Sequence, residues 1–330
     1  MTKSVLASLI KSRFLIQSPY RLIHYVTSDC NCSCKACIRW HRLHHVQNDL
    51  TLDDIYSMLR NAREAGMIYY VAMGGEPLLR KDLPDILKYA KQLGFITAIV
   101  TNGFFLKERR AEILPYTDTL VVSIDAIDHV HDELRNVSGI LTKAIDGIRS
   151  CKDTTTKIGI LSTLSIPTVH RVDEMVQLAK ELGVQITFHP IDLYKGYNDD
   201  LVPSQSEFRE AFVRIRYWKK KGYDIGNSFL YLRYFSSRKP YRCHGPKTFI
   251  NVDANGDIFS CIDVINKKWG TTKTTTFTKI FHSNEFKTFC RSIEQCNRCG
   301  VATVADASFA HTLNPFIIIE KAIETRFSFK

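Results

Sequence analysis

The feature that most constrains the fold is a repeated order of apolar strand and amphipathic helix along the first 220 residues. Six such units follow one another. The predicted strands are residues 22–28, 67–73, 96–100, 119–124, 158–165 and 184–188. The predicted helices are residues 52–64, 83–93, 106–116, 141–151, 172–182 and 207–221. This alternation predicts a parallel sheet, and the continuous apolar character of the strands predicts that both of its faces are buried.

Right-handed crossovers would arrange six such units as an open doubly wound sheet or as a partial barrel. In both folds the functional groups lie at the carboxyl ends of the strands. The segments that follow the predicted strands are mostly polar, glycine or cysteine: Cys30–Cys37, Gly74–Pro77, Thr101–Gly103, Ser123–Asp125, Thr163–Ser165 and His189. We therefore expect one chemistry-bearing face. Two interpretations of His189 remain open: it contacts the substrate, or it is an ordinary hydrogen-bonded histidine.

The regular alternation stops after Gly222. Residues 224–242 are expected to be irregular, and residues 249–259 predict a hairpin with a type I′ turn at Asn255-Gly256. Leu313–Phe329 predicts a tail helix. The expected organisation is an N-terminal extension (1–20), a barrel (21–222), a basic linker (223–242), a small second domain (243–300) and a tail (301–330).

Composition and length narrow the class of protein. The 330 residues are 45% hydrophobic, which suits about two globular domains. The longest apolar stretches fall well short of the roughly 20 residues that cross a bilayer, and residues 1–20 lack the pattern of a secretory signal. We therefore expect a cytoplasmic protein. In a reducing compartment, its ten clustered cysteines point to metal or cluster ligation rather than to disulfides.

The sharpest motif is Cys30-x3-Cys34-x2-Cys37, on a loop just after the first strand. Three thiolates this close can ligate three irons of a cubane cluster and leave the fourth iron open to a reactant. The alternative is a zinc ion that also uses Cys32. Zinc ligands more often come as two separated pairs, so a single packed loop favours the cluster.

A second motif, Gly74-Gly75-Glu76-Pro77, ends the second predicted strand. The glycines would let a ligand approach the backbone, and Glu76 can pair with an ammonium group. Alone this motif would indicate only a turn. It gains weight because it follows the cysteine motif by about one βα unit.

Together these residues resemble the radical S-adenosylmethionine (radical SAM) superfamily, whose fold is a partial (βα)6 TIM-like barrel. The resemblance implies a [4Fe-4S] cluster on Cys30, Cys34 and Cys37, and S-adenosylmethionine (SAM) with its amino group at Gly74–Pro77. Further matches are Thr101-Asn102-Gly103, Ser123-x-Asp125 and His131-Asp132-x2-Arg135. By the resemblance, Asn102, Ser123, Asp125 and Arg135 bind the cofactor, with Ser123 and Arg135 as candidates for its ribose and carboxylate. One departure is Ala36, where the family usually has an aromatic residue.

The C-terminal cysteines form a second set. Cys243 and Cys261 flank the predicted hairpin, and Cys296 and Cys299 form a C-x2-C pair. Four thiolates are a complete ligand set for a second cluster or for zinc. The arrangement resembles the shortened SPASM domain called twitch, which implies an auxiliary [4Fe-4S] cluster for electron transfer or structure. Cys290 is an alternative ligand.

Charge and aromatic residues gather between the two cysteine sets. The net charge is +11, and residues 204–247 hold eleven Lys or Arg against three acidic residues, together with ten aromatic residues. Such a stretch suggests an anionic partner. The alternative is a solvated helix face combined with core aromatics.

The resemblance implies an enzyme that reductively cleaves SAM to a 5′-deoxyadenosyl radical, which abstracts hydrogen from an unreactive carbon. An electron donor such as flavodoxin or ferredoxin would supply the electron. We expect a small or lipid-linked, anionic substrate, with peripheral contact at the inner face of the membrane as an option. Peptide modification ranks second. An RNA-binding iron–sulfur protein is a further alternative, but no RNA-binding motif supports it.

Overall fold

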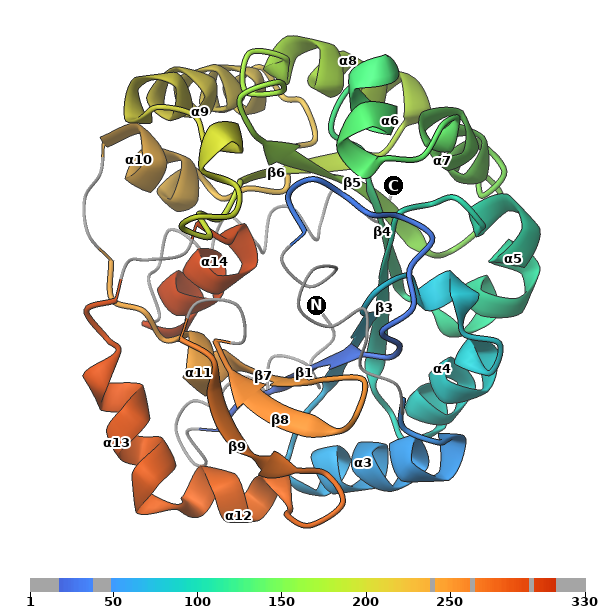
Figure 1. Ribbon diagram of the computed structural model, residues 1–330, viewed down its shortest axis with the longest axis vertical. Coiled ribbons are helices and arrows are strands. Elements are labelled where there is room, and N and C mark those ends of the chain that lie inside the picture. The colour runs from blue at the N-terminus through green and yellow to red at the C-terminus, as the bar shows by residue number, and fades with distance from the viewer. Residues whose placement is uncertain (1–17, 38–48, 238–240, 262–264, 297–299, 313–330) are drawn as a thin grey trace.

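The computed structural model describes residues 18–37, 49–237, 241–261, 265–296 and 300–312 (Figure 1). Its framework is a curved sheet of parallel strands in the order β6-β5-β4-β3-β2-β1. These strands are β1 (Arg21–Tyr25), β2 (Tyr69–Met73), β3 (Ile96–Thr101), β4 (Thr119–Ser123), β5 (Lys157–Leu164) and β6 (Gln185–Pro190). The predicted partial barrel is confirmed. The predicted tail helix, the N-terminal extension up to residue 17, and Cys299 lie outside the described residues.

Helices cover the outside of the curved sheet (Figure 1). They are α3 (Leu52–Glu64), α4 (Leu83–Gln92), α5 (Leu106–Ile113), α7 (Ile140–Arg149), α8 (Val172–Leu182) and α9 (Gln205–Lys220). Local signals set their ends: the Thr51 hydroxyl accepts from Asp54 N at 3.2 Å to begin α3, and Gly183 ends α8 at φ 69°. A further helix between β4 and α7, α6 (His129–Arg135), was not expected as a helix.

Burial alternates along strands β2–β6. Side chains that face the helices, such as Ile99 and Phe188, are fully buried. Those that face inward, such as Val100 and Leu161, are half-buried and line a cavity. The expectation that both faces of the sheet are buried is therefore wrong for the inward face, because the sheet curves around a cavity instead of packing on a second layer.

The C-terminal part extends the same sheet rather than starting a separate one. Strand β7 (Phe249–Val252) pairs in parallel with β1, and β8 (Asp257–Ser260) and β9 (Lys267–Thr271) add antiparallel to it. The hairpin β7–β8 is as predicted, but its turn is not type I′. A type I′ turn needs positive φ at both central residues, and only Gly256 has it, at 91°, whereas Asn255 does not. The Asn255 side chain instead accepts from Asp257 N at 3.0 Å.

In the described part of the chain, five more helices follow α9: α10 (Phe229–Ser237), α11 (Gly245–Thr248), α12 (Phe277–His282), α13 (Asn284–Ser292) and α14 (Ala302–His311). The expectation of irregular structure over 224–242 is thus wrong for α10. Aromatic packing explains this helix: Phe235 stacks on Phe212 of α9 at 4.5 Å between centroids, and Tyr231 contacts Phe212 at 5.6 Å. Such contacts override a weak local propensity.

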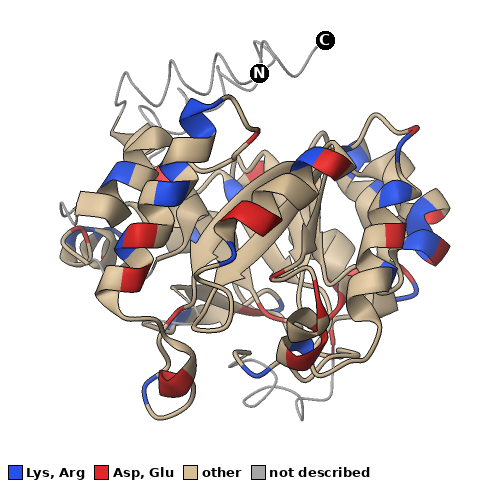
Figure 2. Ribbon diagram, turned by 90° about the horizontal axis from the view of Figure 1, so that it is seen from above, with Lys and Arg blue, Asp and Glu red and all other residues tan. Residues whose placement is uncertain are grey.

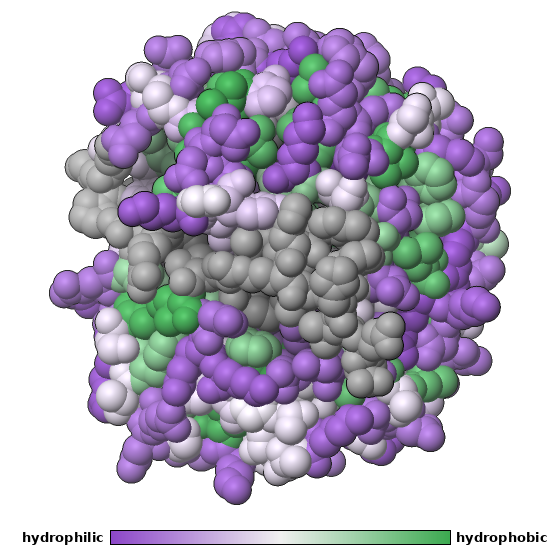
Figure 3. All heavy atoms as spheres, in the orientation of Figure 1, coloured by the Kyte–Doolittle hydropathy of each residue, from purple (hydrophilic) through white to green (hydrophobic). Residues whose placement is uncertain are grey.

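The described surface is mixed in character. Positive and negative side chains are interspersed along the outer helices (Figure 2). On the face shown in Figure 3, the described hydrophobic residues form small separate groups among hydrophilic ones. Within the described residues, none of the helices has the length and apolar character needed to cross a membrane.

Candidate active site

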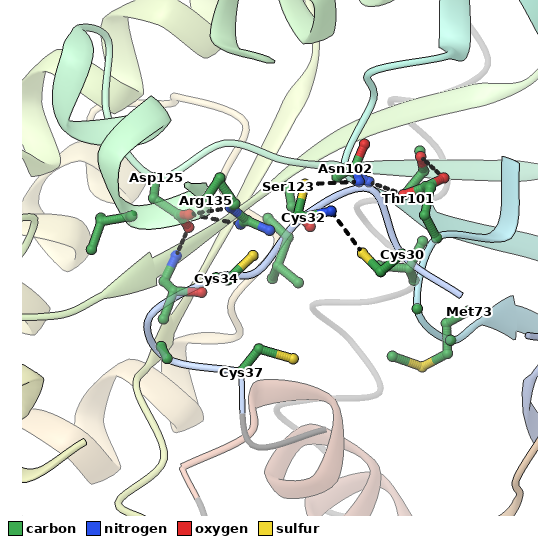
Figure 4. Close-up of a pocket in the computed structure, with 18 of the residues that line it drawn as sticks. Cys30, Cys32, Cys34, Cys37, Met73, Thr101, Asn102, Ser123, Asp125 and Arg135 are labelled. Carbon is green, nitrogen blue, oxygen red and sulfur yellow. Dashed lines mark hydrogen bonds and ion pairs between the residues drawn. The ribbon is translucent and has the colours of Figure 1, made fainter. Parts of the chain in front are cut away.

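A cavity of about 360 Å³ lies inside the barrel, at the carboxyl ends of the strands (Figure 4). All six predicted strand-end segments contribute to its wall. Among the lining residues are Cys30, Cys34, Cys37, Gly74, Gly75, Glu76, Asn102, Ser123, Asp125, Arg135, Thr163, Ser165 and His189. The structure therefore brings the barrel's predicted site residues together, with one exception. Pro77 is buried at the start of a short 3₁₀ helix (Pro77–Leu79) and is not part of the lining.

The cysteine loop turns three of its four thiols to one space. Cys30, Cys34 and Cys37 face a common part of the cavity, whereas Cys32 lies on the other side of the loop (Figure 4). Cys32 is buried, and Asn102 Nδ2 donates to its Sγ at 3.3 Å. A cluster with one open iron needs three thiol ligands, and three thiols face the cavity while the fourth, Cys32, bonds to the protein. The loop therefore fits such a cluster.

The pKa shifts of these thiols also separate Cys32 from Cys30 and Cys34. The hydrogen bond from Cys32, and then the charge of Arg135, lower the pKa of Cys34 to about 6 against the effect of burial. The hydrogen bond from Cys32 also lowers the pKa of Cys30, and these bonds raise the pKa of Cys32 itself. Thiolates are the form that binds iron. Among the described residues, no three His, Cys, Asp or Glu side chains are placed to hold a single metal ion.

Helix α6 and the loop after β3 fix the cysteine loop from two sides. Lys35 N donates to Leu134 O at 2.9 Å, and Asn136 Nδ2 donates to Ser33 Oγ at 2.7 Å. From β3, Asn102 Nδ2 donates to Asn31 Oδ1 at 2.8 Å. These hydrogen bonds fix the position of the loop, which is the preorganisation that a cluster site needs.

The two glycines after β2 make room for the protein's own backbone. A Cβ on Gly75 would lie 2.0 Å from Asp29 O, and one on Gly74 would lie 2.6 Å from Thr27 O. Hydrogen bonds cross this contact, from Gly75 N to Thr27 O at 2.9 Å and from Glu76 N to Asp29 O at 2.7 Å. The chain that leads into the cysteine loop thus fills the space where a Cβ would lie. Both glycines also line the cavity, and their contact with a ligand stays a prediction.

Glu76 is 1% exposed, and its carboxylate accepts three hydrogen bonds. Oε1 accepts from Leu78 N at 2.9 Å and from Thr101 Oγ1 at 2.6 Å, and Oε2 accepts from Asn102 N at 2.8 Å. Burial raises the pKa of Glu76 despite these bonds. A carboxylate offers about four acceptor sites, so one is left for a donor in the cavity. Pairing with an ammonium group stays a prediction.

Asp125 and Arg135 form an ion pair in the cavity wall, beside Ser123. Arg135 donates to Asp125 Oδ2 from Nε at 2.9 Å and from Nη2 at 2.6 Å. Asp125 also accepts from Thr163 N at 2.9 Å, and its own N–H donates to His131 Nδ1 at 3.1 Å. Burial would raise the pKa of Asp125, but the charges of Arg135 and His131 and the hydrogen bonds from Thr163 N and Arg135 together outweigh it, and the pKa is lowered. The pair fixes a cation next to the cysteine loop.

The auxiliary cysteines are only partly described. Cys243 is buried, and Cys261 and Cys296 are half-buried. Burial raises the pKa of Cys243, with a further contribution from the nearby Cys296. Cys290, the alternative ligand, is buried in α13, where burial raises its pKa to about 12. The choice between a second cluster and zinc stays a prediction.

Asp192, Tyr194 and Asp253 are among the lining residues that sequence reasoning did not single out. Asp192 and Tyr194 lie on the loop after β6, where position alone would have identified them as candidates. Asp253 lies at the end of β7, and it borders the cavity because β7 joins the sheet next to β1.

A family model described as the Radical SAM superfamily matches residues 25–167, and the SPASM model, described as an iron–sulfur cluster-binding domain, matches residues 243–300. The chain therefore contains a radical SAM domain. The two matches imply a [4Fe-4S] cluster and SAM in the first region of the chain, and auxiliary iron–sulfur clusters in the second.

Three relatives of known function align with this chain. The Fe-coproporphyrin III synthase of Methanosarcina barkeri is 27% identical over 210 residues, covering 60% of this chain and 52% of that protein. The PqqA peptide cyclase of Streptomyces rochei is 27% identical over 263 residues, covering 74% and 70%. The pre-heme d1 synthase of Dinoroseobacter shibae is 30% identical over 177 residues, covering 53% and 44%. The chain therefore spans about half the length of two of these relatives.

Solved structures show the same fold. SuiB of Streptococcus suis bound to S-adenosylmethionine has a TM-score of 0.71 at 20% identity, with 92% of this chain and 75% of that chain covered. The structure of anSMEcpe with bound AdoMet has a TM-score of 0.66 at 16% identity, with 91% and 98% covered. At such identities the likeness concerns the fold alone.

Proposed function

We propose that this chain reductively cleaves SAM and abstracts a hydrogen atom from a peptide substrate. One observation carries the first part: a single cavity at the strand ends is lined by the three thiols of the cysteine motif, the Glu76 carboxylate and the Asp125–Arg135 pair. These groups come from the ends of β1, β2 and β4 and from helix α6, in a barrel that the family model matches. Three other cavities, between α5 and α7, beside α8 and β6, and beside Arg80, have no thiol among their described lining residues.

In this proposal each group has one task. Cys30, Cys34 and Cys37 would hold the cluster, the remaining acceptor site of Glu76 would take the ammonium group of SAM, and Ser123 and Arg135 would contact its ribose and carboxylate. Cluster and cofactor, when bound, supply one-electron cleavage of a carbon–sulfur bond and hydrogen abstraction from an unreactive carbon. A flavodoxin or ferredoxin would supply the electron.

The protein's own contribution is orientation. Arg135 is held by two hydrogen bonds to Asp125, so its charge sits at a fixed place beside Cys34. Glu76 is held by three donors, so its free acceptor site also points in a fixed direction. Fixed groups avoid the cost of reorganising around a charged cofactor.

The charges of the described residues that line the cavity favour a substrate whose reacting group is not anionic. Four carboxylates line the cavity, and the only cation among the described lining residues is Arg135, which is paired with Asp125. With Arg135 assigned to the cofactor, this balance leaves no cation among the described lining residues for a phosphate or carboxylate group of the substrate. The basic stretch 204–247 supplies none of the described lining residues.

A peptide fits this cavity better than a polyanion, because a peptide can insert one neutral side chain. The alignment with a PqqA peptide cyclase over 74% of this chain supports the same class. Among the structures of similar fold, SuiB is also known bound to its precursor peptide SuiA, and anSMEcpe bound to a peptide.

The second candidate is a small or lipid-linked anionic substrate, with peripheral membrane contact. Exposed basic side chains on and after α9, such as Arg209, Lys220 and Lys221, favour it. Sedimentation with anionic vesicles at low salt separates the two candidates, because only the lipid-linked reading predicts binding.

The activity itself is tested on protein reconstituted without oxygen. Replacing Cys30, Cys34 or Cys37 by Ala should abolish the formation of 5′-deoxyadenosine and remove about four irons per chain. Cys32→Ala is the matched control in the same loop and should do neither. If Cys32→Ala loses iron as fully as Cys34→Ala, the ligand assignment is wrong.

A further inference from the structure

The fourth thiol of the cysteine loop, Cys32, is not among the candidate cluster ligands. It lies in the chain between two of them, Cys30 and Cys34, and its side chain is buried. Buried polar groups in proteins are normally paired, so the bonds of this thiol indicate what it does. Its partners come from the end of β3 and from the cysteine loop itself.

Asn102, at the end of β3, orients the Cys32 thiol. Asn102 Nδ2 donates to Asn31 Oδ1 at 2.8 Å and to Cys32 Sγ at 3.3 Å. Asn102 Oδ1 accepts from Phe104 N at 2.9 Å. A backbone N–H only donates, so turning the amide round would place one donor against another. Asn102 is therefore the donor in its bond with Cys32, and the Cys32 sulfur is the acceptor.

The proton of the Cys32 thiol is then left for its two neighbours in the loop (Figure 4). A thiol has one hydrogen to donate, and the Cys32 side chain hydrogen-bonds the sulfurs of Cys30 and Cys34. The backbone reinforces the first of these contacts, since Cys32 N donates to Cys30 Sγ at 3.4 Å. One residue thus directs donors at two sulfurs that would bind iron.

Cys32 matters most for Cys30. Cys34 is also influenced by the positive charge of Arg135. The favourable contacts of the Cys30 thiolate in the described part of the chain are the thiol and the backbone N–H of Cys32, whereas the charges that act on it, from Glu76 and Cys34, are negative. The thiol of Cys32 therefore offsets negative charge at a place that no cation serves among the described residues.

A donor at a ligand sulfur changes how readily a cluster is reduced. Reduction adds one negative charge, and a hydrogen bond to a ligand sulfur stabilises that charge, so the bond raises the reduction potential. Such a bond is stronger in a buried place than in water, and Cys32 is buried. Removing this donor should make the cluster harder to reduce without removing a ligand.

We propose that the Cys32 thiol donates a hydrogen bond to the ligand sulfur of Cys30 or Cys34, and thereby raises the reduction potential of the cluster that these residues would hold. The inference rests on the cluster assignment within the proposed function and adds a residue that controls the electron transfer. Cys32 is then a positioning residue, which acts through the two ligands rather than by binding iron.

The test is a redox titration of the reconstituted protein without SAM, followed by electron paramagnetic resonance. Cys32→Ala removes the donor, and Cys32→Ser keeps one as a hydroxyl. Cys151→Ala is the matched control, because Cys151 is also a buried thiol, which donates to Gly147 O at 3.2 Å and is not part of the described cavity lining. The spectrum of Cys34→Ala, which should lack the barrel cluster, is subtracted so that only this cluster is followed.

We expect the ratio of reduced to oxidised cluster at a fixed potential to fall three- to tenfold in Cys32→Ala. For a one-electron couple this is a shift of about 30–60 mV to lower potential. Cys32→Ser should have at least the wild-type potential, because a thiol is only a weak donor. Cys151→Ala should match the wild type. Iron content should be the same in all these proteins, which separates an effect on potential from loss of the cluster.

Three outcomes overturn the inference. An unchanged potential in Cys32→Ala, or a potential in Cys32→Ser as low as in Cys32→Ala, excludes the donated proton as the cause and leaves the proposed function intact. Loss of iron in Cys32→Ala to the extent seen in Cys34→Ala makes Cys32 a ligand, so that the ligand assignment fails as well. If the potentials shift as expected but the wild type forms no 5′-deoxyadenosine, the inference holds and the proposed function alone fails.

Discussion

Gly75→Ala is the substitution for which the structure makes the sharpest prediction. The new Cβ would lie 2.0 Å from Asp29 O, 2.5 Å from Asp29 C and 2.8 Å from Ser28 O, all of which are backbone atoms. Ordinary contact begins near 3.4 Å, so the strand end and the chain entering the cysteine loop must separate by more than an ångström. That movement breaks the bond from Glu76 N to Asp29 O, now 2.7 Å long.

The cost follows from these contacts. Overpacking costs about 1–3 kcal/mol, and an unmade buried hydrogen bond costs about 1–3 kcal/mol. The variant should therefore lose about 2–6 kcal/mol of unfolding free energy. Because Asp29 precedes Cys30, the same movement displaces the first cluster ligand, and iron retention should fall as well.

Gly159→Ala is the matched control. Gly159 lies in β5, has no positive φ, and its added Cβ would meet only Gln185 O at 3.4 Å. Gly75 also has no positive φ, so backbone strain enters neither comparison. Urea unfolding followed by circular dichroism, together with iron per chain after anaerobic reconstitution, measures both effects. Equal unfolding midpoints and iron contents for the two variants would refute the reasoning.

The remaining predictions concern the auxiliary site and pH. A variant with Ala at all three cysteines of the barrel motif should still bind about four irons through the C-terminal cysteines; zinc in their place, in protein purified without oxygen, would contradict the auxiliary cluster. Burial, and then the charge of Arg80, lower the pKa of His24 from its usual 6.5 to about 3. The unfolded chain therefore binds the proton first, and stability should fall as the pH drops below 6.5, by roughly 2 kcal/mol at pH 5. His24→Gln, which keeps a partner for Tyr70, should flatten the pH dependence of urea unfolding by that amount, and an unchanged slope would exclude His24 as its source.

The barrel was predictable because its signals are local. Helices α3 and α8 begin and end where the sequence places them, since Thr51 and Gly183 cap them and their apolar residues repeat at helical spacing. The strand-end segments follow from topology once the order of strands and helices is known. These two facts together predict which residues surround the cavity.

What the sequence could not show depends on contacts between distant segments. The role of Gly75 requires knowing that Asp29 passes beside it. The place of Asp253 in the cavity wall requires knowing that β7 pairs with β1. Nε2 of His189 is buried without a hydrogen-bond partner among the described residues, which is a property of its surroundings, so a motif search cannot distinguish it from a satisfied histidine.

The basic, aromatic stretch shows why composition alone gave two competing interpretations. One interpretation was an anionic partner, and the other was a solvated helix face combined with core aromatics. Basic and buried aromatic residues do occur together in this stretch, on different faces of the same helix. On α9, Phe212 and Ile215 are buried, whereas Arg214 is exposed and pairs with Asp173 of α8 at 2.6 Å. The aromatic residues of α10 hold the C-terminal segment, since Tyr231 donates to Gly300 O. An anionic group drawn to the basic side of α9 would therefore lie outside the barrel. It can serve to dock a substrate, but the atom that reacts must enter a cavity whose described lining is acidic.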